Sequence, residues 1–236
     1  MPKFEERLRY ENKYIVTGGQ AELLKCHIEG LCVQDAFSGG QGEYKIRSLY
    51  FDDYKGNSYR DNEIGIEPRS KFRLRFYNDN PDIIFLEQKM KISGKIYKER
   101  TQVTADFYNL LVGDKWEKAD YPTSDALLNR FWTAYHTRGL KPRIIIEYDR
   151  EPFVCPEGDV RITLDKGIAF SDEVENYLRK DLFLQPIMKT GGELLEMKYQ
   201  NFIPDFLYQG IQLRQLQQYT FSKFYLCEMY RRSGGV

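Results

Sequence analysis

Residues 71–77 read KFRLRFY, and basic and apolar side chains alternate along this stretch up to Tyr77. The basic positions are Lys71, Arg73 and Arg75, and the apolar positions are Phe72, Leu74 and Phe76. An alternation with a period of two predicts a β-strand with one apolar and one charged face. Three cations on one face repel one another. The strand therefore raises the question of what neutralises them.

The same alternation recurs in other strand-like segments. Charged residues share one face in RYENKY (9–14), IFLEQKMK (84–91), RIIIEYDR (143–150), VRITLD (160–165) and LLEMKY (194–199). Eight strands are predicted, over residues 9–16, 44–52, 71–77, 83–92, 95–103, 143–152, 160–170 and 193–199. Helices are predicted over 17–31 (capped by Thr17), 54–63, 104–112, 124–139 (capped by Ser124 and ended by Gly139) and 213–232, the last a long helix or a bent pair. This mixture indicates an α+β fold with an antiparallel sheet.

Two arrangements account for the charged strand faces. They are either the solvated side of an ordinary half-buried sheet or the lining of a closed eight-stranded antiparallel β-barrel. Arginine and lysine, rather than uncharged polar residues, dominate these faces, and like charges on neighbouring strands destabilise a solvated sheet. We therefore predict the closed barrel, with helices packed outside it and with residues 1–236 forming one domain.

Composition excludes several classes of protein. The chain has 35 basic and 35 acidic residues, and this balance argues against binding nucleic acid by bulk attraction. Two histidines exclude a histidine-rich metal site, so any metal is expected on carboxylates, as Mg²⁺ or Mn²⁺. The four cysteines are expected to be reduced thiols. No signal peptide or membrane-spanning run is recognisable, so we expect a cytoplasmic protein, with a membrane partner left open.

A lumen lined by cations requires a densely charged anion, because unpaired buried charges cost several kcal/mol each. Polyphosphate fits, since it is linear and matches the forked donors of arginine. Glu11, Glu87 and Glu196 share the charged faces and are predicted to hold a divalent cation that bridges phosphate oxygens. Lys71 lies at the start of its strand and is predicted to lie at the mouth of the lumen.

Eight stretches in order resemble the VTC polyphosphate polymerase domain, a member of the triphosphate tunnel metalloenzymes. They are RYENKY (9–14), SLYFD (48–52), KFRLRFY (71–77), EQKMK (87–91), EYDREPF (147–153), RITLD (161–165), LLEMKY (194–199) and SKF (222–224). The resemblance spans nearly the whole chain. It implies a tunnel in which the γ-phosphate of ATP is transferred onto a growing polyphosphate chain with Mn²⁺ or Mg²⁺.

The resemblance also implies roles for individual residues. By position, the phosphate-binding cations are Lys13, Arg73, Arg75, Lys89, Lys98, Arg150, Arg161 and Lys223. Glu196 matches the metal-binding glutamate, and Tyr148 and Ser222 match polar residues that contact phosphate. Lys91 is added only because it lies on the charged face of its strand. Two roles remain open for Asp165, which either orders Arg161 or caps the following turn.

The chain departs from the pattern of many tunnel enzymes at its first strand. Arg9 stands where an E-x-E-x-K strand has its first glutamate, and only Glu11 and Lys13 remain. Fewer carboxylates argue against a second metal and favour transfer over hydrolysis. The expected activity is therefore polyphosphate polymerase, with ATP, polyphosphate and pyrophosphate or triphosphate as ligands. The alternatives are a tripolyphosphatase or nucleoside triphosphatase in the same tunnel, or a non-catalytic polyphosphate-binding module.

Overall fold

A computed structural model describes residues 8–38, 40, 42–119, 121–188, 191–220 and 222–234. Its eight long strands are β1 (Tyr10–Thr17), β3 (Tyr44–Asp52), β4 (Arg69–Tyr77), β5 (Asn80–Ile92), β6 (Lys95–Val103), β7 (Lys141–Cys155), β8 (Val160–Ser171) and β10 (Gly192–Tyr199). Three strands have two residues each, namely β2 (Val33–Gln34), β9 (Gln185–Pro186) and β11 (Gln218–Tyr219). Each of the eight predicted strands corresponds to one long strand.

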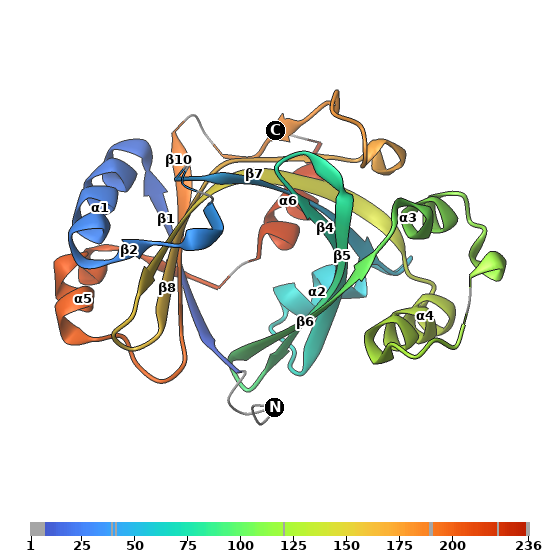
Figure 1. The fold of residues 1–236 in the computed structure, drawn as a ribbon, viewed down its shortest axis with the longest axis horizontal. Coiled ribbons are helices and arrows are strands. Elements are labelled where there is room, and N and C mark those ends of the chain that lie inside the picture. The colour runs from blue at the N-terminus through green and yellow to red at the C-terminus, as the bar shows by residue number, and fades with distance from the viewer. Residues whose placement is uncertain are drawn as a thin grey trace.

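The strands form one antiparallel sheet, in the order β11-β1-β10-β8-β7-β3-β4-β5-β6, with β2 paired to β7 and β9 paired to β8. Figure 1 shows this sheet curving strongly, with β7 spanning the two sides. Outside the sheet ladders, Arg9 and Ile96 form an isolated bridge, and each backbone N–H donates to the other residue's carbonyl, at 3.0 and 2.8 Å.

Continuous closure into a barrel is not seen in the part of the chain that the structure describes. β11 pairs with β1 through Lys13 and Tyr219, and thereby takes up the edge of β1 that a ladder to β6 would need. The structure thus confirms the α+β class and the antiparallel sheet, and the sheet is not closed by a ladder.

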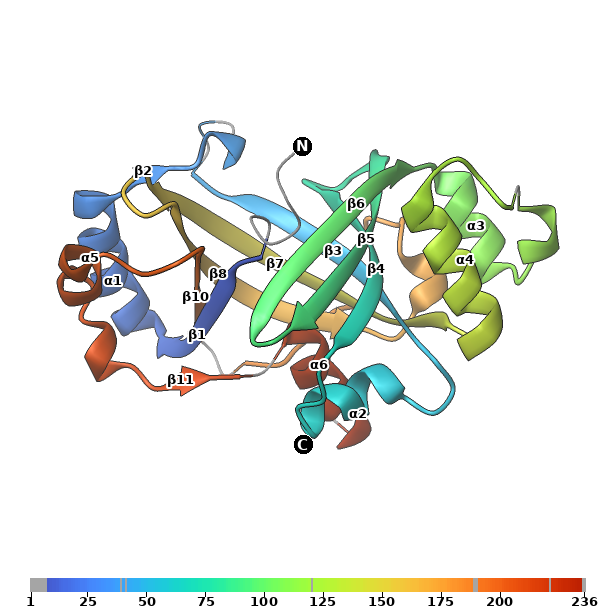
Figure 2. The same cartoon turned by 90° about the horizontal axis from the view of Figure 1, so that it is seen from below.

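The six α-helices are α1 (Gly18–Leu31), α2 (Asn57–Glu63), α3 (Ala105–Val112), α4 (Ala126–Arg138), α5 (Asp205–Gly210) and α6 (Lys223–Arg232). Figure 1 shows α1 with α5 outside one side of the curve, and α3 with α4 outside the other. Figure 2 shows α2 and α6 together near one end of the strands. Among the described residues, no helix combines the length and the apolar character needed to cross a membrane.

Local sequence explains several helix ends. Thr17 and Gln20 form the predicted capping box of α1, and Gly139 ends α4 at a positive φ of 64°. The predicted cap Ser124 is wrong, because the Asp125 carboxylate accepts hydrogen bonds from the backbone of Leu127 and Leu128.

The predicted long helix or bent pair over 213–232 is also wrong. A 3₁₀ turn (Leu213–Gln215) and β11 occupy its first part, and α6 begins only after Ser222. The Ser222 hydroxyl accepts the N–H of Tyr225 and caps this helix at 3.1 Å. β11 lies between the 3₁₀ turn and α6 and pairs with β1. Hydrophobic periodicity alone does not reveal this pairing.

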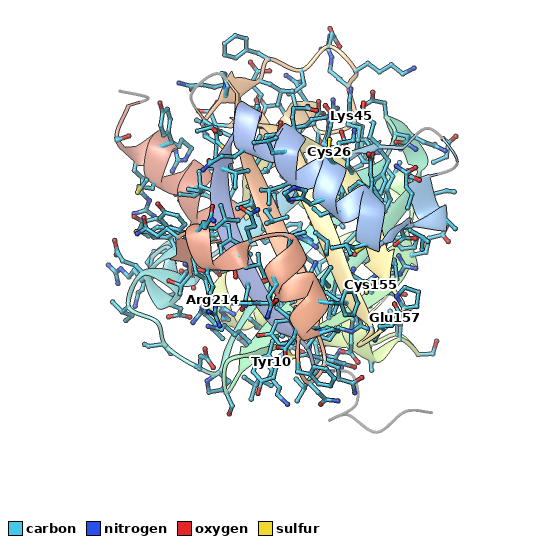
Figure 3. All side chains as sticks on the ribbon, turned by 90° about the vertical axis from the view of Figure 1, so that its left-hand side faces the viewer. Tyr10, Cys26, Lys45, Cys155, Glu157 and Arg214 are labelled. Carbon is cyan, nitrogen blue, oxygen red and sulfur yellow. The ribbon has the colours of Figure 1, made fainter. Side chains whose placement is uncertain are left out.

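The apolar face of β4 points outward, as predicted. Phe72, Leu74 and Phe76 belong to a core that also contains Leu111 of α3 and Phe131 of α4. A second core lies between β1, β8 and β10 and the helices α1 and α5. Figure 3 looks onto these two helices, and it labels Cys26 on α1 and Cys155 at the end of β7. The four cysteines are free thiols, as expected.

A third core lies on the concave face of the sheet. It joins Tyr50 and Tyr148 of the sheet to Phe224 and Cys227 of α6 and to Tyr59 of α2. These apolar contacts fill one part of the concavity and fix α6 against the strands. The remaining part of the same face is hollow.

Candidate functional site

A cavity of about 580 Å³ occupies the concave face of the sheet. Its lining includes thirteen basic residues: Arg9, Lys13, Arg69, Lys71, Arg73, Arg75, Lys89, Lys91, Lys98, Arg150, Arg161, Lys198 and Lys223. Two acidic residues, Glu11 and Glu196, line it as well. All eight cations predicted to bind phosphate are in this set, and so is Lys91; Tyr148 and Ser222 also line the cavity. The structure therefore brings these predicted residues together.

Asp165 holds two of the deepest cations. Its carboxylate accepts hydrogen bonds from Arg150 Nε at 2.6 Å and Nη2 at 2.7 Å, and it lies 2.5 Å from Lys223 Nζ. Burial alone would raise the pKa of Asp165, but Arg150 and Lys223 hold it below its ordinary value. Neither alternative for Asp165 is correct, since it neither orders Arg161 nor caps a turn but joins β7 to α6.

Glu87 neutralises a second pair of cations. Its Oε2 accepts from Arg73 Nε at 2.8 Å and Nη2 at 2.6 Å, and its Oε1 lies 3.1 Å from Lys98 Nζ. The carboxylate is fully buried and is not part of the cavity lining. Arg73 also donates to the Tyr50 hydroxyl at 2.7 Å. Glu87 thus supports the cationic wall from behind.

Glu11 and Glu196 lie on the neighbouring strands β1 and β10. Glu11 pairs with Lys13 at 3.0 Å and Lys89 at 2.9 Å, and Glu196 pairs with Lys198 at 2.5 Å. Burial and Glu196 raise the pKa of Glu11, but the surrounding lysines lower it to about 2. Burial likewise opposes the surrounding cations at Glu196, whose pKa they hold well below its ordinary value. Both groups are therefore carboxylates at neutral pH.

The donor set suits a divalent cation only in part. Among the described residues, no group of three or more His, Cys, Asp or Glu side chains could hold a metal, so Glu11, Glu87 and Glu196 do not form one site. Glu11 and Glu196, however, are adjacent carboxylates that face the cavity. Mg²⁺ characteristically binds through one or two carboxylates together with substrate phosphates. The two carboxylates fit a cation of that kind.

Arginines at the rim are held by carboxylates outside the cavity. Arg161 Nη2 lies 2.5 Å from Asp35 Oδ2, and Arg9 Nη2 lies 2.8 Å from Asp159 Oδ2. The Arg161 side chain is 49% exposed, so an anion reaches it without passing the buried part of the cavity. Lys91 is held similarly by Glu67, at 2.8 Å.

Two of the thirteen cations have no ion pair with a carboxylate among the described residues. Arg75 donates to Ser48 Oγ at 2.9 Å and to the Tyr148 hydroxyl at 3.2 Å. Lys71 donates to Asn62 Oδ1 at 3.0 Å and to Ser222 Oγ at 3.2 Å. Both cations are therefore hydrogen-bonded by neutral groups only, and both are open to an anionic ligand.

The family model of the VTC domain matches residues 8–229. The chain belongs to the VTC domain family. No curated protein is a significant match to the chain.

Solved structures resemble this VTC domain only distantly. The protein PH1819 from Pyrococcus horikoshii has a TM-score of 0.47 and 14% identity, over 95% of this chain and 99% of its own. A putative adenylate cyclase from Bacillus halodurans has a TM-score of 0.45 and 13% identity, over 97% and 92%. The RNA triphosphatase Pct1 from S. pombe has a TM-score of 0.27 and 11% identity, over 94% and 71%. Likeness at this level says nothing about activity.

The structure adds residues to the site of this VTC domain that the sequence prediction omitted. Lys198, Arg69 and Tyr50 line the cavity, and so does Arg9, which was noted only as a departure from a motif. Lys198 shares a strand face with Glu196, and this alternation was the signal that would have identified it. No comparable signal in the sequence marks Tyr50.

Proposed function

We propose that this VTC domain is a polyphosphate polymerase that depends on Mn²⁺ or Mg²⁺. It transfers the γ-phosphate of ATP onto a polyphosphate chain, and residues 1–236 act as one tunnel domain. The observation that carries the proposal is the cavity with thirteen basic and two acidic lining residues. Such an excess of basic residues suits a ligand in which each phosphate unit carries a negative charge. The family match supports the same assignment.

Phosphoryl transfer requires positioning and charge stabilisation rather than a protein nucleophile. A terminal oxygen of the acceptor chain attacks the γ-phosphorus, and the bond to the β–γ bridging oxygen breaks, so that ADP leaves with that electron pair. Arg73, Arg75, Arg150 and Arg161 hold the triphosphate. Lys13, Lys89, Lys98 and Lys223 stabilise the charge on the transferred group, and Tyr148, Ser222 and Lys91 contact phosphate oxygens. Glu11 and Glu196 would hold a divalent cation, which would supply Lewis-acid stabilisation of the phosphate charge.

The product of the reaction tests this proposal. With ATP and Mn²⁺, we expect the protein to form ADP together with a long anionic polymer, and we expect a chelator to stop both. The polymer is separated by gel electrophoresis and ADP is measured by chromatography. Free phosphate without polymer would instead identify a triphosphatase in the same cavity. Tight polyphosphate binding without any ADP would identify a binding module.

Ligand affinity is expected to fall as the pH rises. Burial lowers the pKa of Lys71 and of Lys89 to about 7, and that of Lys98 to about 8. A bound polyanion favours the protonated amines, so binding takes up protons where these lysines are neutral. The affinity for tripolyphosphate should decrease about tenfold or more between pH 7 and pH 9. Calorimetry in buffers of different ionisation enthalpy measures the affinity and the proton uptake together. An affinity that stays constant while no protons are taken up would contradict the expectation.

A further inference from the structure

Lys71 and Arg75 are the two cavity cations that lack a carboxylate partner among the described residues, and they lie on the same strand. Both point to the concave face of β4, with Arg73 between them. Arg73 differs because Glu87 already neutralises it at 2.6 Å. The wall of the cavity along β4 therefore presents two cations that need an anion, separated by one that does not.

The distance between the two positions is too long for one phosphate group. Four residues of antiparallel strand span about 13–14 Å. Arg75 marks the inner end of this span, where Ser48 and Tyr148 bind it. Lys71 marks the other end, where α2 contributes Asn62 and the start of α6 contributes Ser222. A linear chain with several anionic groups can neutralise cations at both positions at once.

The surroundings of Lys71 are built to receive an anion. Its ammonium group lies 4.8 Å from the centre of the Phe224 ring, and its two hydrogen-bond acceptors are neutral. Apart from burial, the largest influences on its pKa are the cations Arg69, Lys89 and Lys13, which lower it, while Asp52 raises it. Burial is the largest cause of the lowered pKa of Lys71 and the neighbouring cations add to it, so an anion bound beside Lys71 would stabilise its protonated form.

We propose that Lys71, with Asn62 and Ser222, forms a distal phosphate subsite that lets this cavity bind long linear polyphosphate more tightly than pyrophosphate. This inference rests on the proposed function in so far as the cavity binds polyphosphate. The chain lies along β4, with one phosphate at Arg75 and a later one at Lys71. Pyrophosphate occupies the Arg75 end without reaching Lys71. The sequence prediction, which left Lys71 as a residue of the mouth, gives it no such role.

Binding measurements on two substitutions test the distal subsite. Lys71→Met keeps the length of the side chain and removes its charge, whereas Lys71→Arg keeps the charge. Calorimetry at neutral pH without ATP gives the affinities for pyrophosphate, tripolyphosphate and a long-chain polyphosphate. We expect Lys71→Met to weaken long-chain binding about tenfold or more, as for the loss of a charged hydrogen bond, and to change pyrophosphate binding less than about twofold. Lys71→Arg should restore most of the long-chain affinity.

Lys45→Met serves as the matched control. Lys45 lies on β3 outside the cavity lining, paired with Asp79 at 2.9 Å, and its removal changes the net charge by the same amount. It should leave all three affinities unchanged. Equal losses of pyrophosphate and long-chain affinity in Lys71→Met, or no loss of either, would overturn the subsite. Because no turnover is involved, this result is independent of whether the product assay finds polymer. Circular dichroism verifies that each variant is folded.

Discussion

Replacing Asp165 by asparagine is expected to destabilise the protein by about 3–5 kcal/mol, since removing one partner of a buried ion pair leaves an uncompensated buried charge. Asp165 is fully buried and holds both Arg150 and Lys223. Asparagine keeps the size of the side chain but loses the negative charge. For a chain of this length, the expected decrease in melting temperature is roughly 6–20 °C. Calorimetric or urea unfolding measures it directly.

An added polyanion should reverse much of this loss. Without Asp165, Arg150 retains only the longer contact with Glu196, at 3.9 Å, and Lys223 loses its carboxylate partner, so a bound phosphate chain can replace the missing charge. We therefore expect tripolyphosphate to raise the melting temperature of Asp165→Asn more than that of the wild type. A ligand that binds only the folded state stabilises it in this way.

Asp181→Asn provides the comparison for this prediction. Asp181 pairs with Arg179 at 2.9 Å, but the two side chains are 72% and 61% exposed. Exposed pairs contribute about 0–1 kcal/mol, so this variant should unfold close to the wild type and respond to tripolyphosphate as the wild type does. If Asp165→Asn were as stable as Asp181→Asn, the buried carboxylate would not hold the cavity together.

The sequence predicts the strands better than it predicts their closure. The alternation in KFRLRFY identifies both faces of β4 correctly, because the apolar set meets α4 and the basic set lines the cavity. Closure depends instead on which segment pairs with the free edge of β1. That segment is β11, a two-residue strand whose short sequence has no periodicity to reveal it.

Most cations of the site were predictable from their strand faces, and the family resemblance added Lys98 and Lys223, but their partners were not predictable. Asp165 is four residues from Arg161 in sequence and pairs with Arg150 and Lys223 instead. Glu87 shares a strand face with Lys89 but neutralises Arg73 and Lys98. Pairing of this kind is set by the register of adjacent strands and by the position of α6, both of which are tertiary properties. The alternation along a strand shows which face carries the charged residues. It does not show which of these charges lack a partner of opposite sign.

Whether a cation is paired with a carboxylate separates residues that stabilise the fold from those that are free to bind a ligand. A cation held by a buried carboxylate is neutralised within the fold, whereas a cation held only by neutral groups can still be neutralised by an anionic ligand. Arg75 is buried and belongs to the second kind. Its removal should therefore reduce activity far more than stability.

Replacing Arg75 by methionine is expected to lower kcat/KM for ATP-dependent polymer formation by about 10²–10³-fold, the typical cost of removing one group that stabilises charge in the transition state. The melting temperature should fall less than in Arg73→Met, because Arg75 donates only to Ser48 and Tyr148 and its removal breaks no ion pair with a described carboxylate. Steady-state kinetics and calorimetry on the same preparation test both parts. Arg73→Met is the matched control on the same strand, and it should lose stability as well as activity because Glu87 loses its closest partner.

A third measurement distinguishes a direct role of Arg75 from a general change in the cavity. Burial raises the pKa of Tyr148, but Arg150, Arg75 and Lys223 together lower it to about 8. Removing Arg75 takes away one of these three cations and one donor to the Tyr148 hydroxyl, so the pKa of Tyr148 should rise in Arg75→Met. Ultraviolet difference titration follows this ionisation. An Arg75→Met protein that melts well below the wild type would show that Arg75 is a structural residue, and an unchanged kcat/KM would remove it from the phosphate-binding set.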